Sequence, residues 1–269
     1  PAPAHLTLHG GGWKLGSLTE RASDAINRQR CRDAGVVVVA IDYRLAPEHR
    51  FPVPLDDCYR ALLWMWTNAY HLGINPYNLS IGGASAGGNL AAAVAIRCRD
   101  EGGPPLRLQL LEVPTLDLTR DMARATLASG VLPDVPQATM NDSTHAYLAD
   151  PADAKHPLAS PLFLPDVRGL PPAHIMTAEF DMLRTEGEAY ADRLATAGVS
   201  VTRRRYPGAL HGTAMLTRSW DQARLWQQDA ARALAVAHET SATHATGAAQ
   251  ETRATGARHA TTRAAHRIG

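Results

Sequence analysis

The sequence predicts an α/β fold with a mostly parallel sheet of about six strands and helices on both faces. Short apolar or β-branched runs alternate with longer helical patterns along most of the chain, and this alternation is typical of a parallel sheet covered on both sides. The chain has 269 residues, of which 45% are hydrophobic and 20% charged. These values suit one globular domain with a sizeable core.

The strand-like runs are short and end in glycine, proline or a polar residue. They cover residues 4–8, 36–41, 79–81, 106–113, 173–177 and 199–206. The run 36–41 is almost continuously β-branched, which predicts a strand buried on both faces. The helical patterns between the strands cover residues 17–33, 55–72, 86–98, 185–197 and 214–237, and several stop at a glycine.

We expect one catalytic domain over residues 1–237. Within it, residues 114–171 are irregular and rich in proline, and they predict a partial lid or insertion with one helix between Pro136 and Leu148. Residues 238–269 are mainly Ala, Thr, Arg and His without apolar periodicity. This composition predicts a low-complexity, disordered tail.

Composition argues against several classes of partner and cofactor. The formal net charge is +1, which indicates neither a nucleic-acid partner nor an acidic membrane. No apolar run is long enough for a transmembrane helix, and no leader peptide is visible. The three cysteines, Cys31, Cys58 and Cys98, lack the spacing of a zinc site or a disulfide framework. We therefore expect free thiols, a cytoplasmic location, and neither metal nor cofactor.

Residues 83–87, Gly-Ala-Ser-Ala-Gly, form a G-x-S-x-G pattern between an expected strand and an Ala-rich expected helix. In that setting the pattern is typical of a nucleophile elbow, a strained turn that exposes the serine hydroxyl. Ser85 is therefore the candidate nucleophile. The structural alternative is a glycine-rich turn without a catalytic role.

A second glycine-rich segment, His9-Gly10-Gly11-Gly12-Trp13, directly follows the first expected strand. Acyl transfer builds negative charge on a carbonyl oxygen, and fixed backbone N–H donors stabilise that charge. We expect the amides of Gly11, Gly12 and Ala86 to form this oxyanion hole. No phosphate-binding glycine pattern is present, and we expect His9 to brace the loop.

An elbow serine needs an acid and then a histidine later in the chain, each on a loop after a strand. Asp181 follows the expected strand 173–177, and His211 follows the strand 199–206. His211 is the candidate general base, and Asp181 would orient its ring. The rival residues lie before a strand, in a helix or in the insertion, and are Asp166, Asp192, His145, His156 and His174.

Five motifs together resemble the hormone-sensitive-lipase family of α/β-hydrolases, from about residue 4 to about residue 235. They are HGGGW at 9–13, DYRLAPEH at 42–49 with FP at 51–52, GASAGGNL at 83–90, EFD at 179–181 and HG at 211–212. The resemblance implies a carboxylic-ester hydrolase without a cofactor. It carries over Ser85, Asp181 and His211 as the triad and Gly11, Gly12 and Ala86 as the oxyanion hole, with DYRLAPEH as a structural loop.

The sequence departs from the family pattern at several positions, including Ala84 before the serine and Met182 after the acid. Thr213 stands where an aromatic residue usually follows His-Gly. Family members also carry a substantial stretch before HGGG that supplies two edge strands and part of the cap, so we expect a fold shortened at the N-terminus and a more open pocket. The strand 36–41 should then be an exposed sheet edge, which favours a homodimer.

The function that the sequence favours is hydrolysis of small, short-chain carboxylic esters through an acyl-Ser85 intermediate. An amidase, or a deacetylase acting on a small acylated metabolite, is the nearest alternative because the same site serves both. The sequence also allows a non-catalytic small-molecule-binding protein or a vestigial fragment of a hydrolase. The His211-Gly212 pair favours an enzyme over a receptor.

Overall fold

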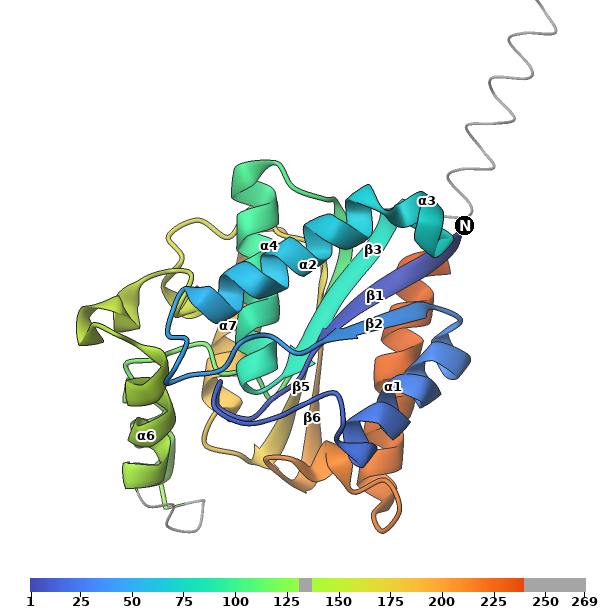
Figure 1. Cartoon of the computed structure of the whole chain (residues 1–269). Helices are drawn as coiled ribbons and strands as arrows, with labels where there is room; N and C mark the ends of the chain where they lie inside the picture. Colours follow the sequence, from blue (N-terminus) through green and yellow to red (C-terminus); the bar gives the residue numbers. More distant parts are fainter. Residues whose placement is uncertain (131–136, 240–269) are drawn as a thin grey trace, which may run out of the picture.

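The computed structural model describes residues 1–130 and 137–239 and shows one six-stranded sheet in the order β2-β1-β3-β4-β5-β6. Every neighbouring pair is parallel, and the predicted α/β fold is confirmed (Figure 1). The strands are β1 (Ala2–Leu8), β2 (Val37–Ile41), β3 (Ile74–Ala84), β4 (Leu106–Glu112), β5 (Ala173–Phe180) and β6 (Val201–Leu210).

Helices cover both faces of the sheet (Figure 1). One face carries α2 (Val53–Thr67), α4 (Ala86–Glu101) and α7 (Arg184–Thr196), and the other carries α1 (Arg21–Ala34) and a final helix over residues 221–239. Two separate hydrophobic clusters fill these two interfaces. They form because successive strand residues point to opposite faces, so that Leu6 and Leu8 pack towards α4 while His5 and Thr7 face the other side.

The predicted helix 55–72 is two helices in the structure. The helix α2 ends at Asn68, whose side-chain amide and backbone N–H both donate to the Trp64 carbonyl, each at 2.9 Å. The short helix α3 (Ala69–Leu72) follows and ends at Gly73 in the left-handed conformation, with φ 65°. Asparagine competes for backbone hydrogen bonds and so ends helices easily.

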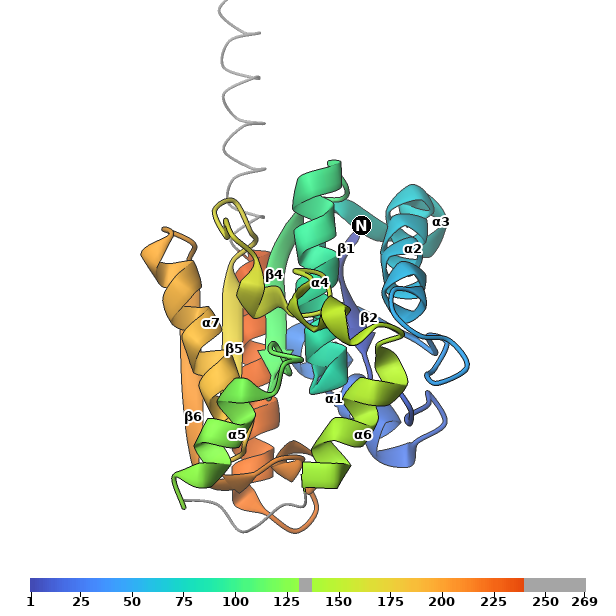
Figure 2. The same cartoon turned by 90° about the vertical axis from the view of Figure 1, so that its left-hand side faces the viewer.

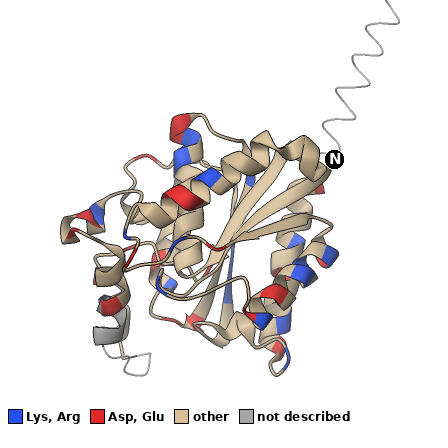
Figure 3. Ribbon diagram, in the orientation of Figure 1, with Lys and Arg blue, Asp and Glu red and all other residues tan. Residues whose placement is uncertain are grey.

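Among the strands of residues 1–130 and 137–239, β2 lies at one edge of the sheet, next to β1. All five of its residues are half-buried. The prediction of burial on both faces is therefore wrong, although the expected edge position is correct. The other edge, β6, carries Arg203, Arg204 and Arg205, each paired with an acidic side chain. Charges of this kind discourage pairing between the edges of two sheets. The interior strands β1 and β3, by contrast, carry no charged residues (Figure 3).

The described part of the insertion, residues 114–130 and 137–171, contains more regular structure than predicted. It contains α5 (Asp121–Ala128), which was not expected, as well as the expected α6 (Gln137–Tyr147) and two short 3-10 turns at Pro151–Lys155 and Pro161–Phe163. The buried Asp117 carboxylate accepts hydrogen bonds from the Thr119 and Met122 amides and so supports the start of α5. Figure 2 shows α5 and α6 at the end of the molecule where the strands finish.

The final helix begins and ends later than the predicted range 214–237. Residues 213–215 form a 3-10 turn, and the helix runs over residues 221–239. The expected domain boundary at 237 therefore falls inside a helix, whose residue His238 is buried. The expected tail lies, from residue 240 onward, outside the described residues. No helix in the described ranges has the length and apolar character needed to cross a bilayer.

Candidate active site

The candidate residues meet at one edge of the sheet because each follows the carboxyl end of a strand. Ser85 comes directly after β3, Asp181 after β5 and His211 after β6, and the glycine-rich segment follows β1. Parallel strands place all their carboxyl ends at the same edge, where open α/β sheets bind ligands. The fold therefore gathers segments that are up to about two hundred residues apart in the sequence.

Ser85 occupies a strained turn between β3 and α4. Its φ is 56° and its ψ is −116°, a conformation that non-glycine residues rarely adopt. Its amide donates to the Glu112 carbonyl at 2.9 Å, and its carbonyl accepts from Asn89 at 3.0 Å. The motif glycines are needed because a Cβ on Gly83 would lie 2.5 Å from the Gly87 carbonyl carbon. This is the geometry of a nucleophile elbow.

Ser85, His211 and Asp181 form one chain of hydrogen bonds. The Ser85 Oγ lies 3.1 Å from Nε2 of His211, and Nδ1 of the same ring lies 2.8 Å from Oδ2 of Asp181. The network assigns the proton of the neutral ring to Nδ1, which leaves Nε2 to accept the serine proton. Asp181 is fully buried and also accepts the Leu183 amide at 2.9 Å. The carboxylate of Asp181 therefore fixes the orientation of the His211 ring.

The electrostatics of the site favour the imidazolium form of His211. Burial opposes the charge, but the Asp181 carboxylate, through its charge and its hydrogen bond, raises the pKa of His211 above the ordinary 6.5. The His211 side chain is 38% exposed, so water moderates the burial penalty. The more distant positive charge of Arg120 acts with burial and lowers this pKa.

The glycine segment forms a tight turn against the elbow. The Gly11 carbonyl accepts from the amides of both Lys14 and Leu15. The φ of Gly11 is 116°, and a Cβ on this residue would lie 2.1 Å from the Leu15 carbonyl oxygen. Gly12 has φ 60°, and a Cβ there would lie 2.5 Å from the Ser143 hydroxyl. A side chain at Gly11 would clash with the backbone, and one at Gly12 would require the Ser143 side chain to move. Both glycines line the same cavity as Ser85.

Ala86 is the first residue of α4 and is fully buried directly behind Ser85. Its amide is one of the N–H groups that a helix leaves unpaired at its start. Gly11 and Gly12 line the same cavity as Ser85, and Ala86 follows Ser85 directly in the chain.

The segment 42–51 packs against the glycine turn and braces it. The Tyr43 hydroxyl donates to the His9 carbonyl at 2.7 Å, and the Tyr43 ring stacks on the His9 ring at 4.2 Å. The Ala46 amide donates to the Trp13 carbonyl at 2.8 Å. Trp13 is buried and stacks on Tyr147 of α6 at 4.4 Å. The segment that resembles the family motif therefore holds the turn in place without entering the site.

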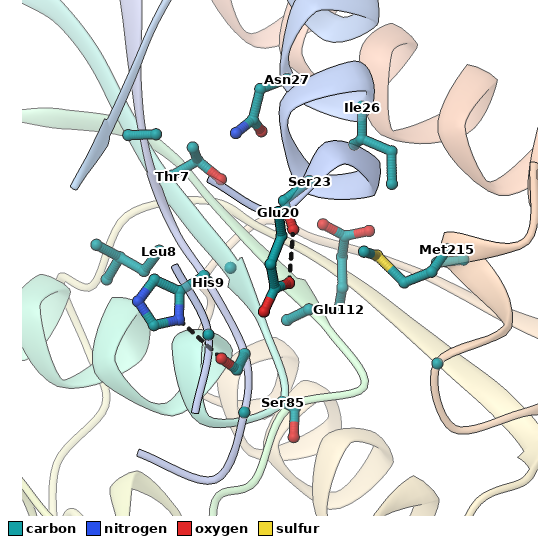
Figure 4. Close-up of a pocket in the computed structure, with 18 of the residues that line it drawn as sticks. Thr7, Leu8, His9, Glu20, Ser23, Ile26, Asn27, Ser85, Glu112 and Met215 are labelled. Carbon is teal, nitrogen blue, oxygen red and sulfur yellow. Dashed lines mark hydrogen bonds between the residues drawn. The ribbon is translucent and has the colours of Figure 1, made fainter. Parts of the chain in front are cut away.

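A cavity of about 410 Å³ opens beside Ser85 and extends between the sheet and α1. Its volume lies in the range typical of small-molecule sites, about 300–1,000 Å³. Figure 4 shows Ser85 at one end of this space, with Asn27 and Ser23 of α1, Thr7 of β1 and Glu112 of β4 around the rest.

Sequence reasoning missed a buried polar cluster in the wall of this cavity. Nη2 of Arg30 lies 2.8 Å from Oε2 of Glu112, which also accepts from the Trp226 indole at 2.7 Å. Gln227 accepts from Arg30 and donates to the Ala214 carbonyl at 2.9 Å. The available signal was Arg30 itself, because it lies four residues after the buried Ile26 and so on the same helix face.

The rival residues have other partners. Asp166 pairs with Arg168, and Asp192 pairs with Arg203. His174 lies 2.6 Å from the Thr202 hydroxyl, and the His156 ring accepts the Leu158 amide. The carbonyl of His145 accepts from Arg50. Thr213, at the unusual position, is buried, and its hydroxyl accepts from the Leu210 amide at 2.8 Å. It thus closes the turn that carries His211.

The model of a family described as the α/β-hydrolase fold matches residues 5–215. Carboxylesterase NlhH of Mycobacterium tuberculosis is 39% identical over 214 residues, which are 78% of this chain and 66% of that protein. The chain belongs to the hormone-sensitive-lipase family of α/β-hydrolases. The carboxylic ester hydrolase LipN of the same bacterium is 42% identical over 78% of this chain and 57% of its own length.

Solved structures of the α/β-hydrolase family agree with these relatives. The carboxylesterase EstE1 from a metagenomic library is 37% identical with a TM-score of 0.83, covering 88% of this chain and 80% of its own. The hyperthermophilic esterase from the archaeon Pyrobaculum calidifontis is also 37% identical, with a TM-score of 0.82 over 87% of this chain and 77% of its own. The chain spans about two thirds of NlhH and somewhat more than half of LipN.

Proposed function

We propose that this α/β-hydrolase is a serine carboxylesterase that cleaves small, short-chain esters through an acyl-Ser85 intermediate. The observation that carries the proposal is the hydrogen-bonded chain from Ser85 through His211 to Asp181, built on a strained elbow. The relatives that are described as carboxylesterases support the same chemistry.

The reaction follows from these contacts in two halves. The Ser85 oxygen attacks the ester carbonyl while Nε2 of His211 takes the hydroxyl proton. The amides of Gly11, Gly12 and Ala86 donate to the oxygen that becomes negative. His211 then protonates the leaving alcohol, and the C–O bond to that alcohol breaks. A water molecule, activated by the same histidine, attacks the acyl-serine and releases the acid.

The test is release of p-nitrophenol from p-nitrophenyl acetate, butyrate and decanoate. We expect the wild type to hydrolyse the two shorter esters faster than the decanoate. Ser85→Ala should lower kcat by ~10³-fold or more. Ser129→Ala serves as the matched control, because Ser129 lies at the end of α5 and its hydroxyl only donates to the Thr126 carbonyl. Equal rates for wild type and Ser85→Ala would refute the assignment.

The same assay separates an esterase from an amidase and from a non-catalytic protein. An amidase or deacetylase would cleave p-nitroacetanilide with a kcat/KM that, divided by the rate constant for alkaline hydrolysis of the same compound, exceeds the corresponding ratio for p-nitrophenyl acetate. A folded wild type that hydrolyses neither compound would indicate a binding or vestigial protein. The intact chain of hydrogen bonds from Ser85 to Asp181 favours an enzyme, because a binding protein does not need an oriented base.

We also infer that the protein works as a homodimer in the cytoplasm. The edge strand β2 leaves one row of ladder N–H and C=O groups for pairing with a second copy. Light scattering tests the homodimer, because Val39→Pro should convert a dimer to a monomer while Val39→Thr should not.

The cytoplasmic location is supported by the three cysteines. Cys31, Cys58 and Cys98 are free thiols, as in a reducing compartment. Cell fractionation tests this location.

A further inference from the structure

The cavity beside Ser85 has both apolar and polar lining. Leu8, Leu15 and Met215 belong to the apolar part. We call the part between β1, β4 and α1 the polar end of the cavity, and it is lined by Thr7, Ser23, Asn27, Arg30 and Glu112 (Figure 4). Apolar pockets usually carry only a few polar groups, and those groups set the orientation and identity of the ligand.

The polar end of the cavity holds groups that the protein leaves without partners. Arg30 and Glu112 are buried, with side chains 5% and 4% exposed. Their ion pair uses Nη2 of Arg30 and Oε2 of Glu112. Within residues 1–130 and 137–239, no hydrogen bond or ion pair is found for Nη1 of Arg30, Oε1 of Glu112 or the side-chain amide of Asn27. A buried ion pair is stable only when its remaining donors and acceptors are satisfied.

We place the acyl group, rather than the leaving alcohol, in this cavity. The leaving alcohol must receive its proton from Nε2 of His211, whose side chain is 38% exposed, and it can then depart to solvent. The acyl group stays bound to Ser85. Because Ser85 and Glu112 line the same cavity, an acyl chain that enters the cavity can reach the Glu112 side chain.

We propose that the cavity selects esters whose acyl chain carries a hydrogen-bonding oxygen or amide near its far end. Arg30 and Asn27 donate to that group, and Glu112 accepts from it when it carries a proton. The inference rests on the proposed esterase function and adds the class of acyl chain. An unsubstituted chain of the same length would leave the three polar side chains desolvated and unpaired, which costs binding.

The experiment compares esters of equal chain length in which one CH₂ is replaced by oxygen. One pair is p-nitrophenyl 4-methoxybutyrate and hexanoate, and the other is p-nitrophenyl 3-methoxypropanoate and pentanoate. Each kcat/KM is divided by the rate constant for alkaline hydrolysis of the same ester, so that intrinsic reactivity cancels. We expect the wild type to prefer the ether in at least the longer pair by about tenfold, the effect of one or two hydrogen bonds.

Asn27→Leu is the diagnostic variant, because Asn27 is only half-buried and its loss does not break the Arg30–Glu112 pair. It should reduce the ether preference about fivefold. Gln29→Leu is the matched control on the same helix, outside the cavity lining, and should leave the preference unchanged. Thermal melts of both variants verify that they fold.

The possible outcomes distinguish a failure of the proposed acyl-chain selection from a failure of the proposed esterase function. Rapid hydrolysis of all four esters without an ether preference would overturn this inference and leave the esterase function standing, since water would then satisfy the polar end of the cavity. An ether preference that survives in Asn27→Leu would also overturn it, because selection would arise elsewhere. Failure of the wild type to hydrolyse any of the esters would overturn both.

Discussion

At the scale of single residues, the pair Asp181 and His211 determines how the proposed enzyme responds to pH. Only neutral His211 can accept the serine proton. Because Asp181 outweighs burial and raises the pKa of His211 above 6.5, kcat/KM should increase with pH through an inflection above 6.5 and then level off. Asp181→Asn should lower kcat by ~10³- to 10⁴-fold and move the inflection to lower pH.

A pH–rate profile with a stable ester checks this prediction, and Asp192→Asn on the surface of α7 is the control. An inflection that stays in place in Asp181→Asn would show that another group titrates.

Glu186 is a second residue with a pH-dependent effect, in this case on stability. It is fully buried in α7, and its Oε2 accepts from the amides of Leu116 and Asp117 at 2.6 and 2.9 Å. Burial raises the pKa of Glu186 to about 8, although Arg120 and the two amides act in the opposite direction. The folded protein therefore holds this carboxyl protonated, while the unfolded chain ionises it above its ordinary pKa of 4.5.

The unfolded state thus binds fewer protons at this site between about pH 4.5 and 8, and the contribution of Glu186 to the free energy of unfolding should fall across that range by up to about 1.4 kcal/mol per pH unit. Glu186→Gln resembles the protonated carboxyl and should remove this fall. Urea unfolding at pH 5, 6, 7 and 8 measures the effect. The same slope in wild type and Glu186→Gln would contradict it.

At the scale of elements, the close contact of α4 with the end of β1 and the glycine turn depends on Gly87, which has no side chain. A Cβ on Gly87 would lie 2.2 Å from the Leu8 carbonyl oxygen and 2.5 Å from that of His9. Alanine usually stabilises a helix relative to glycine by up to about 1 kcal/mol. Here we expect Gly87→Ala to destabilise the protein by about 2 kcal/mol or more and to reduce esterase activity, because α4 must move away from β1.

Gly102→Ala at the other end of α4 is the control for this prediction. Gly102 has open space around it, and its φ of 67° makes alanine cost only about 1 kcal/mol. Denaturant unfolding of the two variants gives the comparison. An equal or smaller loss in Gly87→Ala would mean that the helix and the turn have room to separate.

Some elements of the fold and site can be predicted from the sequence, and others cannot. The residues of the elbow and the glycine turn are contiguous, so the sequence predicts the motif, the strand before it and the helix after it. Asp181 and His211 follow from chain order alone. The Arg30–Glu112–Gln227 cluster was not predicted, because it joins α1, β4 and the final helix, and no local pattern links residues that far apart. The helix α5 was missed because its support, Asp117, lies in an irregular segment.

At the scale of the whole molecule, a buried chain of polar groups joins the final helix to the sheet. His238 lies 2.9 Å from the Ser80 hydroxyl on one side and 2.7 Å from Asn78 on the other, and His5 contacts the same hydroxyl at 2.9 Å. Burial, with help from Arg107, lowers the pKa of His238 to about 4, and burial lowers the pKa of His5 well below 6.5. Both rings are therefore held neutral.

Because the unfolded chain protonates these histidines below about pH 6.5 while the folded protein does not, the stability that the two histidines contribute should be complete above that pH and decline as the pH falls towards 4. Each histidine contributes a slope of up to about 1.4 kcal/mol per pH unit. His238→Gln should make the decline shallower in urea unfolding between pH 4.5 and 7. The exposed His71→Gln should not, and identical slopes for all three proteins would exclude this role for His238.

The final helix also has a consequence for the order in which the protein becomes complete during synthesis. Ser85, Asp181 and His211 all leave the ribosome before the helix over residues 221–239. That helix supplies Gln227, which contacts Arg30 and the Ala214 carbonyl, and Trp226, which donates to Glu112. A nascent chain that already contains the three proposed reacting residues would still lack Gln227 and Trp226. The proposed discrimination between acyl chains would therefore be acquired after the proposed triad residues have been synthesised.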